Sequence, residues 1–152
     1  MGDQSMKWAK SVAKGLLGYR PASLQVGALC LRIRDGKTQV LLITSRDTGR
    51  WVIPKGWPMR GRSLSGAAKQ EAWEEAGVVG KIDKEPAGAF RYDKILDSGL
   101  ATPTDVVVFP LRVETLMKSY PEEHQRKRKW FAPKEAAKLV AEEELQKILR
   151  KL

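Results

Sequence analysis

The segment from Gly56 to Val78 constrains this chain more than any other, because it joins a glycine-containing turn to a helix that carries three glutamates. Ser63 or Ser65 is suited to cap the start of a helix, and Gly77 is suited to the left-handed turn that ends one. Four alanines between these ends favour helical backbone. They are Ala67, Ala68, Ala72 and Ala76.

Three glutamates of this predicted helix, Glu71, Glu74 and Glu75, share one face because they stand at positions i, i+3 and i+4. Like charges at this spacing repel by roughly 0.2–0.5 kcal/mol per pair. A hard divalent cation such as Mg²⁺ turns that repulsion into coordination by carboxylate oxygens. The alternative is the solvent-exposed face of an amphipathic helix. The glycines at both ends and the strand-like runs on both sides favour a functional site.

The segment resembles the Nudix box, Gly-x5-Glu-x7-Arg-Glu-U-x-Glu-Glu-x-Gly-U, in which U is a bulky apolar residue. Ala72 is a small version of the first U, and two positions depart from the pattern. Arg62 stands where the box has its first Glu, and Gln70 stands where it has Arg. The positions that match at the same spacing are Gly56, Glu71, Glu74, Glu75, Gly77 and Val78.

The two departures fall on a pair of residues that, in the family, braces the loop against the helix. Both members of the charged pair are absent together, and Gln70 can still donate a hydrogen bond. An arginine at position 70 facing Arg62 would be repelled by it. We therefore expect an altered brace beside a retained set of cation ligands.

The composition describes a single domain with a strongly basic balance. A chain of 152 residues is long enough to bury about two-thirds of its unfolded surface. The net charge of +10 suggests an anionic partner, namely a polyphosphate, a nucleic acid or a membrane surface; a basic surface that only keeps the chain in solution is the alternative. The single Cys30 lies in an apolar run, which indicates a reduced core thiol and a cytoplasmic protein.

Nothing in the sequence predicts association with a membrane, because no apolar run approaches the length of a membrane span. Residues 1–20 hold apolar side chains at helical spacing between lysines. We expect them to form a basic N-terminal appendage, either a short packed helix or a frayed end, before a Nudix domain over residues 21–152. A membrane-surface or targeting role for the appendage is the alternative.

Alternating and apolar runs predict strands over residues 24–34, 38–44, 51–53, 87–92, 105–113 and 126–131. Asp35 and Gly36 predict a hairpin turn between the first two. Gly80 is expected to open a looser region, and residues 93–103 to form a mobile loop or hairpin tip. Pro133 is suited to the first turn of a final helix, and a turn-rich segment with Leu145 follows.

Three further stretches, residues 40–46, 50–54 and 127–131, are similar to the diphosphoinositol polyphosphate phosphohydrolases and their bacterial relatives. With the box, this resemblance extends from Leu24 to Val140, most of the chain. It implies an α/β fold, the Nudix-type α/β/α sandwich with a mixed central sheet and a catalytic loop-helix. The resemblance therefore predicts an enzyme with one central site.

The resemblance also implies roles for the box residues in a Mg²⁺-dependent hydrolysis, with Mn²⁺ as an alternative metal. Glu71 and Glu75 would ligate the metal, and the backbone carbonyl of Gly56 would complete its shell. Glu74 would be a further ligand or the general base. Which glutamate acts as base varies across the family, so Glu71 and Glu74 are both candidates.

Substrate recognition is expected to be mostly electrostatic. The guanidinium group of arginine binds phosphate through two hydrogen bonds at once. We expect Arg46, Arg50 and Arg128 to meet at one rim above the metal. Trp57 is suited to stack on a nucleobase, with a packed loop residue as the alternative. The predicted substrate-binding residues are Ser45, Arg46, Arg50, Lys55, Trp57 and Arg128.

These features predict an enzyme that hydrolyses a diphosphate linkage in a highly phosphorylated small molecule. Diphosphoinositol polyphosphates are the first candidate substrate and dinucleoside polyphosphates the second. Lys55-Gly56-Trp57 departs from the triple-glycine turn of the inositol enzymes, and Arg62 and Gln70 depart from the box. These departures leave two alternatives open. One is a pyrophosphohydrolase that acts on the 5′ end of RNA. The other is a catalytically weak Nudix module that binds an anionic ligand.

Overall fold

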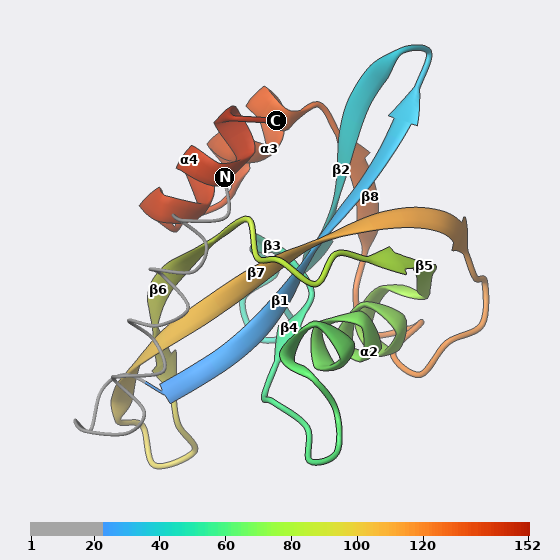
Figure 1. The fold of residues 1–152 in the computed structure, drawn as a ribbon. Helices are drawn as coiled ribbons and strands as arrows, with labels where there is room; N and C mark the ends of the chain where they lie inside the picture. Colours follow the sequence, from blue (N-terminus) through green and yellow to red (C-terminus); the bar gives the residue numbers. More distant parts are fainter. Residues whose placement is uncertain (1–22) are drawn as a thin grey trace.

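The computed structural model describes residues 23–152, so the appendage predicted over residues 1–20 lies outside the described residues. The described chain alternates strands with three helices (Figure 1). In chain order the elements are β1 (Ser23–Arg34), β2 (Lys37–Thr44), β3 (Trp51–Val52), β4 (Lys55–Gly56), α2 (Leu64–Ala76), β5 (Val78–Ile82), β6 (Gly88–Ile95), β7 (Ala101–Leu116), β8 (Arg128–Phe131), α3 (Pro133–Leu139) and α4 (Glu143–Arg150). No helix within residues 23–152 is long and apolar enough to span a membrane.

The strands form one mixed sheet whose central path runs β3-β2-β1-β7-β5. β1 and β7 are parallel, with Leu24 opposite Asp105 and Leu31 opposite Arg112. The other pairs are antiparallel, and they place β4 beside β1, β6 beside β7 and β8 beside β2. The predicted mixed central sheet is therefore confirmed.

Helices cover both faces of the sheet, α2 on one and α3 with α4 on the other (Figure 1). Successive β1 residues alternate between the two cores, so that Ala28 and Cys30 pack toward α2 while Leu29 packs toward α3 and α4. The predicted α/β/α sandwich is confirmed. Cys30 is fully buried, and that burial raises the pKa of its thiol far above the ordinary value, as expected of an unreactive core cysteine.

The ends of α2 and the first hairpin follow the local signals in the sequence. Ser63 caps α2, because its side chain accepts a hydrogen bond from the Gly66 N–H at 3.0 Å. Gly77 ends the helix in the left-handed region, with φ of 67°. Asp35 and Gly36 both have positive φ, 51° and 75°, as a tight hairpin turn requires.

The structure corrects the prediction between α2 and β7. Gly80 does not open a looser region but belongs to β5, where the pairing register with β7 shifts between Val79 and Gly80. A side chain at position 80 would overlap with the carbonyl of Arg112 on β7, which explains the glycine. A five-residue strand with a glycine at a bulge has too little alternation to be recognised in the sequence.

Two further elements are longer than predicted. β6 and β7 remain paired out to Ile95 opposite Ala101, so the expected loop over residues 93–103 contracts to a turn at residues 96–100. The pairing continues where apolar side chains such as Ile95 and Leu100 are exposed, so a buried apolar pattern does not mark it in the sequence. The turn-rich segment at the C-terminus is the helix α4, whose Leu145 and Leu149 are buried.

Candidate active site

A cleft of about 370 Å³ opens where α2 faces β4, the segment after β2 and the segment between β7 and β8. Carboxylates from α2 and from the segment before β8 line one part of the cleft, and lysines with aromatic rings line another. We call these parts the acidic wall (Glu71, Glu74, Glu75 and Glu122) and the basic wall (Gln25, Lys55, Trp57, Tyr92 and Lys94). The cleft is also lined by Ser45, Arg46, Asp47, Val52, Gly56 and Arg126.

Gly56 and Glu71 meet at the floor of the cleft. A Cβ atom at position 56 would overlap with the Glu71 carboxylate, so only glycine lets α2 approach β4 this closely. Burial raises the pKa of Glu71 to about 8, and the negative charges of Glu75 and Glu74 act in the same direction. Glu71 is therefore a carboxyl that needs a nearby positive charge in order to ionise at neutral pH.

Glu75 and Glu74 are each held by a protein donor. Glu75 is 8% exposed; its Oε1 accepts a hydrogen bond from the Lys55 backbone N–H at 3.2 Å, and its Oε2 lies 3.5 Å from Arg126 Nη2. Burial raises the pKa of Glu75, while Arg126 acts in the opposite direction. Glu74 Oε1 accepts a hydrogen bond from Gln70 Nε2 at 3.2 Å. The acidic wall is thus ordered by contacts from three elements.

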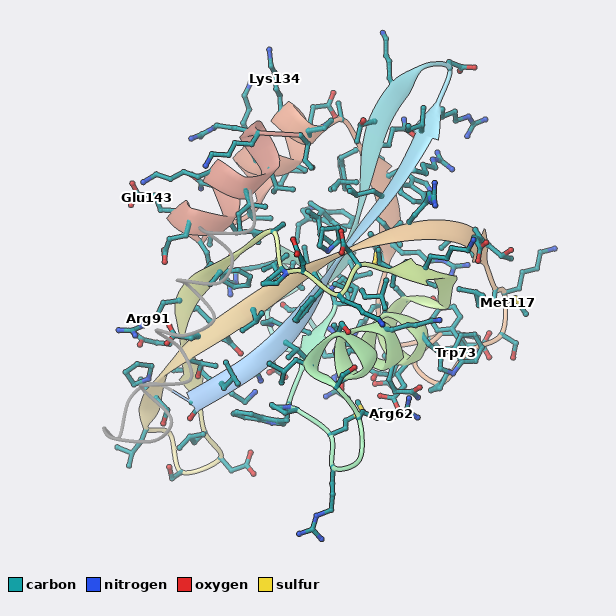
Figure 2. All side chains as sticks on the ribbon, in the orientation of Figure 1. Arg62, Trp73, Arg91, Met117, Lys134 and Glu143 are labelled. Atoms are coloured by element: carbon teal, nitrogen blue, oxygen red, sulfur yellow. The ribbon has the colours of Figure 1, made fainter. Side chains whose placement is uncertain are left out.

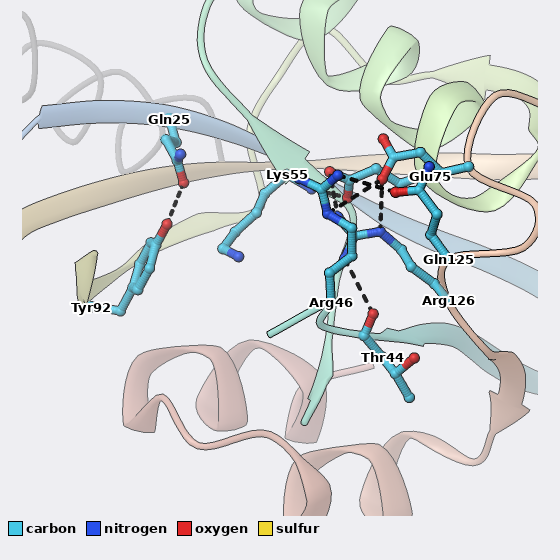
Figure 3. A network of polar contacts seen from close by, with 9 residues as sticks. Gln25, Thr44, Arg46, Lys55, Glu75, Tyr92, Gln125 and Arg126 are labelled. Atoms are coloured by element: carbon cyan, nitrogen blue, oxygen red, sulfur yellow. Dashed lines mark hydrogen bonds and ion pairs between the residues drawn. The ribbon is translucent and has the colours of Figure 1, made fainter. Parts of the chain in front are cut away.

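Arg126 is a site residue that the sequence prediction missed. Its Nε donates to Glu122 Oε1 at 3.1 Å, its Nη1 donates to the Thr44 carbonyl at 3.1 Å, and its side chain is only 9% exposed (Figure 3). The sequence prediction chose Arg128, two residues further on. Glu122 lies in a turn and Arg126 follows it outside any helix, so their spacing of four carried no signal in the sequence.

The donor set of the acidic wall fits a hard divalent cation by its chemistry, since carboxylate oxygens gather beside a glycine backbone. Within residues 23–152, no three His, Cys, Asp or Glu side chains are yet arranged closely enough to hold a metal ion. Glu75 and Glu74 instead contact Arg126 and Gln70.

The basic wall is built around Lys55. Its Nζ lies 4.8 Å from the centre of the Tyr92 ring, and the Tyr92 hydroxyl donates to Gln25 Oε1 at 2.7 Å. Burial lowers the pKa of Lys55 and raises that of Tyr92 to about 12. Lys94 Nζ lies 5.7 Å from the ring of Trp57, which is 45% exposed. The sequence prediction missed Gln25, Tyr92 and Lys94, because neither the start of β1 nor β6 shows a motif.

The structure brings four of the six predicted substrate-binding residues to the cleft, namely Ser45, Arg46, Lys55 and Trp57. Ser45 Oγ accepts a hydrogen bond from the Arg50 N–H at 3.2 Å and so holds the turn after β2. Arg46 Nη1 donates to Gln125 Oε1 at 3.1 Å, and its side chain is largely exposed. Arg46 can therefore reach an anion in the cleft.

The other two predicted residues, Arg50 and Arg128, do not line the cleft, so the three arginines do not meet at one rim. Arg50 Nη1 lies 3.9 Å from Glu142 Oε1, before α4. Arg128 Nη1 donates to the Ala76 carbonyl at 2.6 Å, and its guanidinium lies 4.8 Å from the Tyr120 ring. The side chain of Arg128 therefore satisfies the C-terminal end of α2 instead of facing the cleft.

The two departures from the box have different surroundings. Gln70 contacts Glu74 on the same helix, as noted above. Arg62 is exposed near the start of α2, and among residues 23–152 its side chain has no hydrogen bond or ion pair (Figure 2). No loop-to-helix ion pair thus replaces the family's brace at position 62.

The NUDIX domain family model matches residues 23–152, and the chain therefore belongs to the Nudix family. "Nudix hydrolase 13, mitochondrial" of Arabidopsis thaliana is 32% identical over 120 residues, which cover 76% of this chain and 59% of that protein. "Diphosphoinositol polyphosphate phosphohydrolase 3-alpha" of Mus musculus is 33% identical over 126 residues, 80% of this chain and 73% of that protein. The sequence-based resemblance to the Nudix family and to the diphosphoinositol polyphosphate phosphohydrolases is confirmed.

Solved structures show the same fold. A C. elegans Ap4A hydrolase in a binary complex superposes with a TM-score of 0.63 at 22% identity, covering 85% of this chain and 93% of that chain. The E. coli dihydroneopterin triphosphate pyrophosphohydrolase superposes with a TM-score of 0.62 at 16% identity and the same coverage. At these identities the likeness concerns the arrangement of the sandwich alone.

Proposed function

We propose that this protein hydrolyses a diphosphate linkage in a highly phosphorylated small molecule and uses Mg²⁺, with Mn²⁺ as the alternative metal. One observation carries the proposal: the same cleft is lined by the glutamates of α2, by two lysines and by two arginines. Carboxylates suit a divalent cation, and the cationic side chains suit the phosphates. The names of the relatives that act on diphosphoinositol polyphosphates and on Ap4A agree with this substrate class.

The acidic wall would carry the chemistry. Glu71 and Glu75 would hold the metal together with the Gly56 carbonyl, and the metal would neutralise phosphate charge and acidify a water. Glu71 and Glu74 both remain candidates for the base that takes the proton of that water. Glu71 and Glu74 are both more exposed than Glu75, which is buried.

The basic wall would recognise the substrate. Lys55 and Lys94 lie with Arg46 around one compact cleft, which fits a small and densely charged anion better than an extended RNA strand. Diphosphoinositol polyphosphates are therefore the first candidate. The exposed indole of Trp57 at the same cleft favours dinucleoside polyphosphates as the second, because a nucleobase can stack on it.

The test is a panel assay of phosphate release, with Mg²⁺ or Mn²⁺, on an inositol pyrophosphate, diadenosine polyphosphates and triphosphorylated RNA. We expect turnover of a small polyphosphate and none without the metal. Turnover of RNA alone would replace this proposal with the RNA 5′-pyrophosphohydrolase. Binding of the anions without turnover would replace it with the weak binding module.

The buried thiol of Cys30 supports the cytoplasm as the compartment.

A further inference from the structure

The positive charge that compensates the carboxylates of the acidic wall comes from outside α2. In its last turn α2 has no basic residue, and Gln70 meets Glu74 with a neutral amide. Glu75 is 8% exposed and cannot be solvated freely. An isolated carboxylate at that depth is costly unless a cation lies beside it.

That cation is Arg126, which belongs to the segment between β7 and β8 and contacts α2 through Glu75. Its guanidinium contacts Glu75 at 3.5 Å, Glu122 at 3.1 Å and the Thr44 carbonyl at 3.1 Å, so all three nitrogens have partners. The side chains of Arg126 and Glu75 are 9% and 10% exposed. This is a built, buried ion pair and not a contact between mobile surface groups.

The same segment is tied to the C-terminal end of α2 at the backbone. The Glu122 N–H donates to the Glu74 carbonyl at 3.0 Å, and the Met117 N–H donates to the Gly77 carbonyl at 2.8 Å. Arg128 donates to the Ala76 carbonyl at 2.6 Å. Carbonyls at a helix end have no partner within the helix. The tie therefore fixes where Arg126 and Glu122 enter the cleft.

We propose that Arg126 is a positioning residue that serves as the internal counter-cation of the acidic wall, holding Glu75 and Glu122 in place until a divalent cation supplies further positive charge. Arg126 reaches the side of Glu75 and Glu122, whereas Glu71 on the Gly56 side has no arginine or lysine ion pair within residues 23–152. The divalent cation would enter on this Glu71 side. The inference rests on the proposed function only for the presence of that metal.

The test is thermal unfolding of Arg126→Gln and of the unchanged protein, each with and without Mg²⁺ or Mn²⁺ and with no substrate. Without metal, Arg126→Gln should unfold at least about 6 °C lower, because removing one partner leaves buried carboxylates unpaired. The rise in Tm caused by the metal should be at least about twice that of the unchanged protein, because the metal now supplies the missing charge.

Two arginine variants serve as matched controls. Arg128→Gln removes a contact with α2 that is not an ion pair, so it should lower the metal-free Tm without enlarging the metal-induced rise. Arg91→Gln removes an exposed ion pair with Asp105 on β7. Neither residue lines the cleft, so this variant should change neither quantity beyond a degree or so.

Three results would overturn the proposal: an unchanged metal-free Tm in Arg126→Gln, a metal-induced rise no larger than that of the unchanged protein, or the same enlarged rise in Arg128→Gln. If Arg126→Gln does not fold, the double variant Arg126→Gln/Glu122→Gln decides, since it also removes one buried negative charge. Folding of the double variant supports the counter-cation, and its failure to fold contradicts it. None of these measurements needs turnover, so an inactive protein in the panel assay would leave this test intact.

Discussion

The two walls of the cleft hold their charged groups in different ways. On the acidic wall, Glu75 is fixed by Arg126 and by a backbone N–H, and Glu71 is pressed against Gly56. On the basic wall, Lys55 and Lys94 lie over aromatic rings, and their ammonium groups have no carboxylate ion pair within residues 23–152. Under the proposed function, this difference corresponds to one wall that carries the reaction and one wall that recognises an anion.

The largest effect should follow from Glu71→Gln or Glu75→Gln. Each change removes a proposed metal ligand or base from the acidic wall, and a general base alone is worth roughly 10²–10⁴-fold in rate. Turnover should fall by orders of magnitude in phosphate-release assays with saturating Mg²⁺, while circular dichroism shows a folded protein. Glu114→Gln on β7 is the matched control, because Glu114 is exposed and does not line the cleft. Near-normal rates in both site variants would show that the metal assignment is wrong.

Gly56→Ala should come next in size. Its new methyl group would overlap with the Glu71 carboxylate, so Glu71 must move away from the floor of the cleft. We expect more than about a tenfold loss of turnover together with a lower Tm, in line with overpacking of a close contact. Gly66→Ala is the control, since its methyl group would meet the Ser63 hydroxyl at 3.0 Å and Arg62 Cβ at 3.8 Å, both at the start of α2 and neither in the cleft. Equal activity of the two variants would contradict the role of Gly56.

On the basic wall, Lys55→Ala and Arg46→Ala should raise KM for a polyphosphate and change kcat less. Lys55 should matter more, because it is half-buried whereas Arg46 is largely exposed. A well-ordered charge-assisted contact is worth about 1.5–3 kcal/mol, and an exposed one less. Trp57→Ala should raise KM for a diadenosine polyphosphate only. Steady-state kinetics on both substrates check this ranking, and an equal loss on the inositol substrate in Trp57→Ala would contradict stacking.

The acidic wall also predicts how stability depends on pH. The folded-state pKa of Glu71 is about 8, raised from 4.5, so its contribution to stability is fully present below about pH 4.5 and lost as the pH rises through 8. Without metal, Glu71→Gln should therefore raise the Tm relative to the unchanged protein more at pH 8.5 than at pH 5. Thermal unfolding of both proteins across this window measures the difference. A gain that is the same at both pH values would contradict burial of an ionisable Glu71.

The smallest effect concerns the two departures from the box. Restoring the family pair with Arg62→Glu and Gln70→Arg should preserve or modestly improve turnover, and the two changes together should do more than either alone. Arg62 is exposed, so the coupling should be a few tenths of a kcal/mol at most. Strictly additive single and double variants in the turnover assay would show that no coupling exists.

The sequence predicted the parts of this molecule that depend on local signals. The caps of α2, the turn at Asp35 and the face shared by the glutamates all arise within a few residues of one another. Arg126 and Tyr92 could not be predicted in this way, because β6 and the segment before β8 meet the cleft only after the sheet is assembled. Arg128 was wrongly predicted to line the cleft for the same reason, since its partner is the end of α2, which is distant in the sequence.

The most direct test of the account is a paired measurement of kcat and KM for Glu71→Gln and Lys55→Ala on one inositol pyrophosphate, at saturating Mg²⁺. The acidic wall should act on the reaction, so Glu71→Gln should lower kcat with little change in KM. The basic wall should act on binding, so Lys55→Ala should raise KM with little change in kcat. If both variants changed the same parameter by similar factors, the division of the cleft into a reacting wall and a recognising wall would be contradicted.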